Sequence, residues 1–173
     1  GGGWLAELGF SDFAGSTLVH STGGAAALAG IMLLGSRAGR FDSKGEARAM
    51  KPFAASSIPL VTIGVFILWL GWFGFNGGSQ LAIGTFDDAV AVSGIFINTN
   101  LAACGGVMAA ATITRLMYGK TDVVQMLNGA IGGLVAVTAE PLAPTPLAAI
   151  FIGAIGGLIV VFGTKLLLSL IHI

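Results

Sequence analysis

The stretch "DFAGSTLVHSTGG", from Asp12 to Gly24, places an imidazole two helical turns after a carboxylate in a chain that is otherwise strongly apolar. Of the 173 residues, 55% are hydrophobic and only 9% are charged, and the mean hydropathy is +0.92. Soluble domains carry about 25% charged residues. The composition therefore predicts an all-α integral membrane protein, in which His20 is an unusual residue.

Five charge-free runs predict five transmembrane helices, because each is close to or longer than the ~20 residues that cross a hydrocarbon core. The glycines in "GFNGGSQLAIGTF" predict that the second helix ends near Phe75 or Asn76, and Pro59 predicts a bend early in that helix. Three prolines in "EPLAPTPLA" separate the last two spans. The runs are residues 13–36, 52–86, 89–114, 123–139 and 141–164.

The basic residues predict the orientation of these helices. If five helices alternate in direction, all eight Lys and Arg residues fall on one side, and short loops rich in Lys and Arg stay in the cytoplasm. The N-terminus should therefore face outward, and an outer face with acidic but no basic residues would attract cations. The basic residues are Arg37, Arg40, Lys44, Arg48, Lys51, Arg115, Lys120 and Lys165; the outer acidic residues are Glu7, Asp12, Asp87, Asp88 and Glu140.

Other features exclude several classes of partner and site. The net charge is zero, which gives no indication of a nucleic-acid partner. Cys104 is the one cysteine, so a disulfide or a CxxC metal site is excluded. The start "GGGWLAELGF" lacks the features of a signal peptide, and we expect the chain to be an internal piece of a longer protein.

Glycine provides 28 residues, and its spacing predicts close helix packing. Gly129 and Gly133 form one GxxxG step, and Gly153 and Gly157 form another. Such steps let helix backbones approach one another in lipid. No strand precedes these glycines, so they do not indicate a dinucleotide-binding loop.

His20 has two interpretations. An ionisable side chain inside a span is costly and by default indicates function. The alternative is a buried neutral imidazole bonded to a nearby hydroxyl of Ser16, Thr17 or Ser21. For Asp12, at the outer start of the span, the favoured interpretation is a helix cap, because a carboxylate there accepts bonds from free backbone amides.

The aromatic stretch "LGWFGFNGGS" also has two interpretations. Trp72, Phe73 and Phe75 are typical of an interfacial aromatic belt. Alternatively, an aromatic ring beside the hydroxyl of Ser79 could hold a small cation. The polar residues Asn98, Thr99, Asn100 and Asn128 are expected to make interhelical hydrogen bonds.

Three functions are compatible with these residues. In a transporter, His20 would point into a lumen. In an intramembrane enzyme, it would act as a general base and would need a nucleophile within about 3 Å, with Ser16, Thr17 or Ser21 as candidates. In a sensor or structural subunit, side chains would fill the lumen and no substrate would pass.

Four motifs in order along the chain resemble the ammonium transporter family, the Amt/Mep/Rh group. They are "DFAGSTLVHSTGG", "GWFGFNGGS", "NTNLAA" and "NGAIGGLVAVTA". The resemblance covers residues 1–173 as one partial transporter domain. It implies an all-α fold of eleven transmembrane helices, the first ten in two inverted halves, with helices five to nine in this chain.

The resemblance also implies roles for individual residues. His20 matches the first of two pore histidines, Phe75 matches one of two stacked gating phenylalanines, and Ser79 matches the hydroxyl of an outer ammonium site. Asp12 matches an acidic residue that shapes this site. The tryptophan of the outer site, the other phenylalanine and the second histidine would lie beyond the two ends of the chain. The family's "TAGC" is replaced here by "TAEP", residues 138–141.

The mechanism implied by the resemblance is transport of ammonium through a hydrophobic pore. Ammonium is recruited at the acidic outer mouth, loses water and a proton, and passes the histidines as ammonia. The resemblance further implies a homotrimer in the plasma or inner membrane, a PII-type regulatory partner on the cytoplasmic face, no cofactor or metal, and no enzymatic activity. An ammonium sensor or an Rh-like gas channel with the same fold is the alternative.

Overall fold

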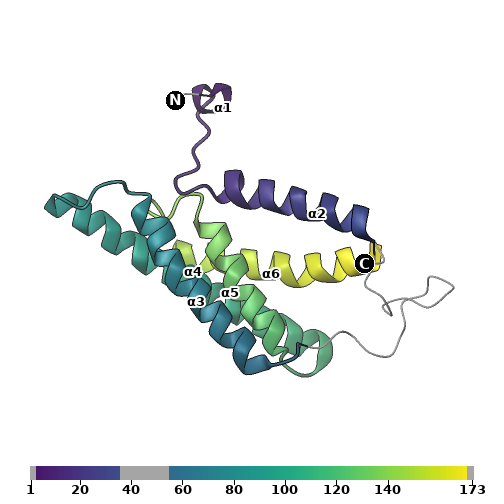
Figure 1. Ribbon diagram of the computed structural model, residues 1–173. Helices are drawn as coiled ribbons and strands as arrows, with labels where there is room; N and C mark the ends of the chain where they lie inside the picture. The colour runs from purple at the N-terminus through teal and green to yellow at the C-terminus, as the bar shows by residue number, and fades with distance from the viewer. Residues whose placement is uncertain (1–2, 36–54, 171–173) are drawn as a thin grey trace.

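The computed structural model describes residues 3–35 and 55–170, and in these ranges all regular structure is helical (Figure 1). This confirms the all-α prediction. The basic residues of the segment 37–51, and His172, lie outside the described residues. The elements are α1 (Trp4–Glu7), the π-helix η1 (Ser16–Ser21), α2 (Thr22–Leu34), α3 (Ile58–Gly78), α4 (Phe86–Tyr118), α5 (Val123–Val137) and α6 (Pro146–Leu170).

The five predicted apolar helices differ in length. Four segments of the described chain are long and apolar enough to cross a membrane: Ser16–Leu34, Ile58–Gly78, Phe86–Tyr118 and Pro146–Leu167. The remaining helix, α5, has 15 residues. At 1.5 Å per residue it rises about 22 Å, which is less than the ~30 Å of a hydrocarbon core. Four of the five predicted spans are therefore long enough to cross a membrane in the described chain, and a crossing by α5 stays a prediction.

Local signals explain where the helices begin and end. A capping box between Thr85 and Asp88 starts α4, and Gly119 ends it in the left-handed conformation with φ of 71°. The predicted bend at Pro59 is wrong. Pro59 lies in the first turn of α3, where its missing N–H would have had no helical partner. α3 continues to Gly78, slightly beyond the predicted end.

The core is formed by α4, α5 and α6, whose backbones touch at glycines. A Cβ added to any of these glycines would collide with the carbonyl oxygen of Gly106 or of Ala102, so no larger side chain fits. This confirms that the predicted GxxxG steps are packing sites. The glycines are Gly129 and Gly133 in α5 and Gly153 and Gly157 in α6.

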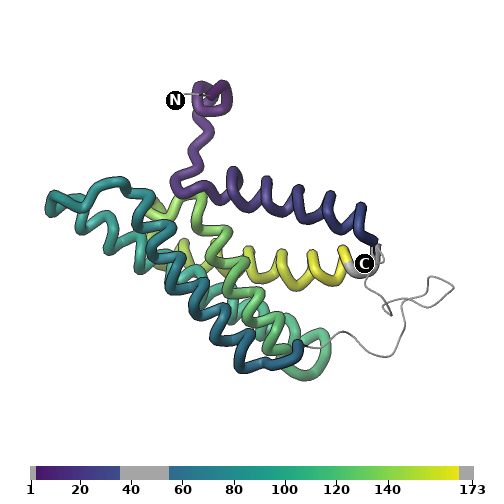
Figure 2. Tube along the Cα trace, viewed as in Figure 1, coloured from purple at the N-terminus to yellow at the C-terminus, as the bar shows by residue number. Residues whose placement is uncertain are grey.

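By contrast, α2 stands apart from this core. Among the described elements it contacts only η1, and none of its residues is buried. Figures 1 and 2 show α2 separated from α6, with the N-terminal segment projecting from the bundle. Leu33 at the end of α2 is 89% exposed. The apolar surface of α2 is therefore available to lipid or to further helices.

Candidate functional site

The turn that carries His20 is a π-helix, Ser16–Ser21, which leads directly into α2. Gly15 precedes it with φ of 90°, a conformation that residues with a Cβ rarely adopt. Single π-helical turns are rare and occur frequently at functional sites. The local backbone thus sets His20 apart from the regular helix that follows.

Asp12 caps this turn. Its Oδ2 accepts hydrogen bonds from the backbone N–H groups of Thr17, at 3.1 Å, and Leu18, at 2.9 Å. This confirms the capping interpretation of Asp12. The second carboxylate oxygen, Oδ1, is buried and has no hydrogen-bond partner among the described residues.

His20 lies in an aromatic cluster with two residues of α3. Its imidazole stacks on the indole of Trp72, with ring centroids 5.3 Å apart and planes 11° apart. Phe75 lies 6.1 Å from the imidazole and is tilted by 59°. Phe75 and Trp72 also contact each other, with centroids 6.0 Å apart. The structure therefore brings together His20 and Phe75, two of the residues that the sequence singled out.

A hydrogen bond within the turn orients the imidazole. Nδ1 of His20 lies 3.1 Å from the carbonyl oxygen of Ser16. A carbonyl oxygen only accepts, so the hydrogen must be on Nδ1, and in the neutral ring Nε2 then has a free lone pair. His20 is partly buried, and the neutral ring keeps one acceptor that is not used in this bond.

Ser79 ends α3, one turn after Phe75. Its hydroxyl donates a hydrogen bond of 2.7 Å to the carbonyl oxygen of Phe75. Because a hydroxyl has one proton, the Ser79 oxygen keeps its lone pairs for a donor. An N–H cation is such a donor. Phe75 is 40% exposed, so this end of α3 is accessible.

The segment around η1 is attached to the end of α5. The Ser16 hydroxyl donates to the carbonyl oxygen of Val135 at 2.6 Å, and the Phe13 N–H donates to the carbonyl oxygen of Ala139 at 2.7 Å. The Ser16 proton is therefore directed toward α5 and not toward His20. This geometry does not provide the Ser16–His20 pair that an intramembrane enzyme would need.

Sequence reasoning did not predict that Trp72 stacks on His20, because a tryptophan at this position is also typical of an interfacial belt. In the structure its Nε1–H donates to the Thr138 hydroxyl at 2.7 Å, and Thr138 was not singled out as a site residue. The available signal was the position of Trp72 one turn before Phe75 on the same helix. The contact of Trp72 with His20 depends on the position of η1 relative to α3, and these two elements are far apart in the sequence.

The predicted interhelical hydrogen bond is confirmed for Thr99, whereas Asn98 bonds to a loop and not to another helix. The Asn76 amide in α3 donates to the Thr99 hydroxyl in α4 at 3.0 Å. The Asn98 amide donates to the carbonyl oxygens of Pro141, at 3.0 Å, and Pro144, at 2.8 Å. Asn98 thereby holds the proline-rich loop between α5 and α6 against α4.

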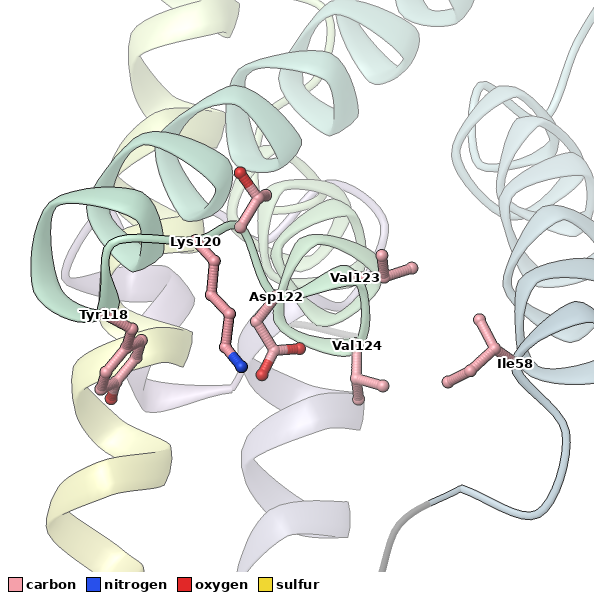
Figure 3. A pocket seen from close by; sticks show the side chains of 7 residues that line it. Ile58, Tyr118, Lys120, Asp122, Val123 and Val124 are labelled. Atoms are coloured by element: carbon pink, nitrogen blue, oxygen red, sulfur yellow. The ribbon is translucent and has the colours of Figure 1, made fainter.

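A cavity of about 510 Å³ lies at the turn between α4 and α5, at the opposite end of α5 from the aromatic cluster (Figure 3). The Lys120 and Asp122 side chains lie on the same side of this turn. None of the predicted site residues lines this cavity. In residues 3–35 and 55–170, no group of three or more His, Cys, Asp or Glu side chains could hold a metal ion.

The fold and the aromatic cluster define the class, an α-helical membrane protein with an ionisable ring held at the junction of apolar helices. The chain belongs to the Ammonium Transporter Family, whose sequence model matches residues 1–173. It is 45% identical to the ammonium transporter Amt2 of Archaeoglobus fulgidus, over 94% of this chain and 36% of that protein. It is 40% identical to ammonium transporter 1 member 1 of Arabidopsis thaliana, over 86% of this chain and 30% of that protein.

Solved structures of related proteins have the same fold. A structure described as a sensor Amt protein superposes with a TM-score of 0.88 at 35% identity, over 97% of this chain and 40% of that chain. Candida albicans Mep2 superposes with a TM-score of 0.82 at 32% identity, over 96% of this chain and 35% of that chain. The chain thus spans about a third of the length of these relatives.

Proposed function

We propose that this chain is a partial transporter domain, residues 1–173, which conducts ammonium or ammonia across the membrane as part of a longer protein. The supporting observation is the partly buried imidazole of His20, stacked on Trp72 and beside Phe75, in a chain of the Ammonium Transporter Family. The relatives named as ammonium transporters support the choice of substrate.

Recruitment of the cation is assigned to the end of α3 and the adjacent turn. The Ser79 oxygen keeps lone pairs for an N–H donor, and the Phe75 ring offers a face to a cation. Asp12 shapes this region by holding η1 through its cap. The predicted orientation, with the N-terminus outside, puts these residues at the outer mouth, where acidic residues would raise the local cation concentration.

Deprotonation is the step that lets the substrate enter an apolar path. A bare cation in such a path loses its hydration at a large cost, whereas ammonia is neutral. The free lone pair of His20 Nε2 is an acceptor for a proton or for an N–H group. His20 is therefore proposed to accept the released proton at Nε2 and to pass it on toward the inner side, so that ammonia and the proton cross separately and net charge is transferred.

The remaining properties of the longer protein are proposed from family membership. They are a homotrimer, a location in the plasma or inner membrane, a PII-type regulatory partner on the cytoplasmic face, and transport without an enzymatic step. A sensor is the second candidate function, because one structure with a TM-score of 0.88 is described as a sensor Amt protein.

Electrophysiology of the longer protein with ammonium and methylammonium tests the proposal. Ammonium-dependent current that saturates with concentration supports a transporter that moves net charge. A sensor that does not conduct would give neither current nor a change of internal pH. An Rh-like gas channel would change internal pH without current. Either of the last two results would contradict the proposed cation recruitment followed by net charge transfer.

A further inference from the structure

We infer that Thr138 is the positioning residue of His20, because it supports both the stacking partner of the imidazole and the backbone that carries it. This inference rests on the proposed conduction function. Thr138 is the C-cap residue of α5 and is completely buried. It does not touch the imidazole and acts through Trp72 and through the segment before η1.

The first support passes through the side chain. The Thr138 hydroxyl donates to the carbonyl oxygen of Leu134 at 2.6 Å, and this bond uses its one proton. Its lone pairs can then only accept, and the Trp72 Nε1–H, which can only donate, lies 2.7 Å away. The direction of both hydrogen bonds is therefore fixed. The bond sets the rotation of the indole on which His20 stacks.

The second support passes through the backbone. The carbonyl oxygen of Thr138 accepts a hydrogen bond of 3.3 Å from the Ala14 N–H, and that of Ala139 accepts one of 2.7 Å from the Phe13 N–H. Residues 13 and 14 lead directly into the π-helical turn of His20. The end of α5 thus makes two contacts. Its backbone holds the turn that carries His20, and the Thr138 side chain holds the indole of Trp72 that stacks on the imidazole.

The position of Thr138 is itself well determined. It follows the last turn of α5, which packs through glycines against α4 and α6. The loop after it is held by the two hydrogen bonds of Asn98 to Pro141 and Pro144. Buried hydrogen bonds with fixed direction tolerate little rotation of the groups they join. The indole of Trp72 therefore keeps one orientation, and the imidazole of His20 that stacks on it does so too.

The test uses the longer protein with Thr138→Val, which keeps the shape of the side chain and removes the acceptor. We expect the ammonium current to fall about fivefold, the factor that corresponds to one ordinary hydrogen bond. We also expect the indole N–H resonance of Trp72 to move upfield in ¹⁵N–¹H spectra, and the pH dependence of the current to change. Thr138→Ser restores the acceptor and should recover all three readouts.

Thr114→Val is the matched control, since Thr114 is also buried and donates to a carbonyl oxygen in its own helix, that of Ala110 at 2.7 Å. It should lower the thermal stability without moving the pH profile or the Trp72 resonance. The inference is overturned if Thr138→Val leaves the current and the Trp72 resonance as in the wild type, or if Thr114→Val lowers the current equally. If His20→Ala leaves the current unchanged, the conduction role fails instead, while the Trp72 resonance in Thr138→Val still reports whether the hydrogen bond exists.

Discussion

The ring of Phe75 lies 6.1 Å from the imidazole of His20 and is tilted by 59° to it. Phe75 therefore lies beside the imidazole near the end of α3, and 40% of its surface is exposed. A ring in this position can narrow the entrance to any path that passes His20. This relationship connects the proposed gate with the proposed conduction site.

Phe75→Ala is expected to widen the path at this level. Removing the ring leaves space that neighbouring helices close only in part. The pore radius next to His20, measured in a structure of the variant of the longer protein, checks this expectation. Flux need not rise, because the proposed contact between the cation and the ring would be lost as well.

Phe66→Ala is the control for this variant. Phe66 lies on the same helix, is 59% exposed, and stacks on Trp69 away from the cluster. It should leave the radius at His20 unchanged. An unaltered radius in Phe75→Ala would count against a gating role.

Asp12→Ala should destabilise the π-helical turn by about 1 kcal/mol, because the cap bonds to Thr17 and Leu18 are lost. Asp12→Asn keeps an acceptor oxygen and removes the charge. If Asp12 acts through its cap, the asparagine variant should retain most of the ammonium current and the alanine variant should not. Equal loss of current in both variants would show that the charge itself is required.

Gly106→Ala should destabilise the three-helix core by about 1–3 kcal/mol, as overpacking does. The added Cβ would collide with the backbone of Gly129. Gly94→Ala on the same helix has open space around the new Cβ and should be neutral or stabilising by about 0.5–1 kcal/mol. Thermal unfolding in detergent compares the two variants. Equal melting temperatures would contradict the packing of α4 against α5.

The 173-residue chain reconstituted by itself is expected not to conduct ammonium. α2 contacts only η1 among the described elements, so these helices do not enclose a path beside His20. A polar group exposed to lipid costs several kcal/mol and favours misassembly. Internal pH of liposomes after an ammonium pulse measures conduction. A saturable response that depends on His20 and exceeds that of protein-free liposomes would refute this expectation.

Local features of the fold and site could be predicted from the sequence. The apolar runs gave the positions of the helices, the glycine spacing gave the packing of α5 and α6, and Asp12 before the turn indicated a cap. Each of these depends on residues close together in the chain. The error at Pro59 has a local cause as well: a proline bends a helix only after its first turn, and the start of α3 at Ile58 was not evident.

The arrangement around His20 could not be predicted in this way. The stacking on Trp72 and the bond from Trp72 to Thr138 join η1, α3 and α5, which are distant in sequence. The π-helical turn that carries His20 was not predicted from the residue pattern either. A tryptophan at the end of an apolar helix is equally typical of an interfacial belt. Tertiary packing decides between these interpretations.

The central claim is that His20 takes part in conduction, and the ammonium-driven current of the His20→Ala variant of the longer protein tests it most directly. The account predicts a current lower by on the order of a hundredfold, the low end of what a positioned proton-transfer group contributes. The amount of protein in the membrane, measured in parallel, separates lost conduction from lost expression. A His20→Ala variant with wild-type current and wild-type ion selectivity would contradict the account.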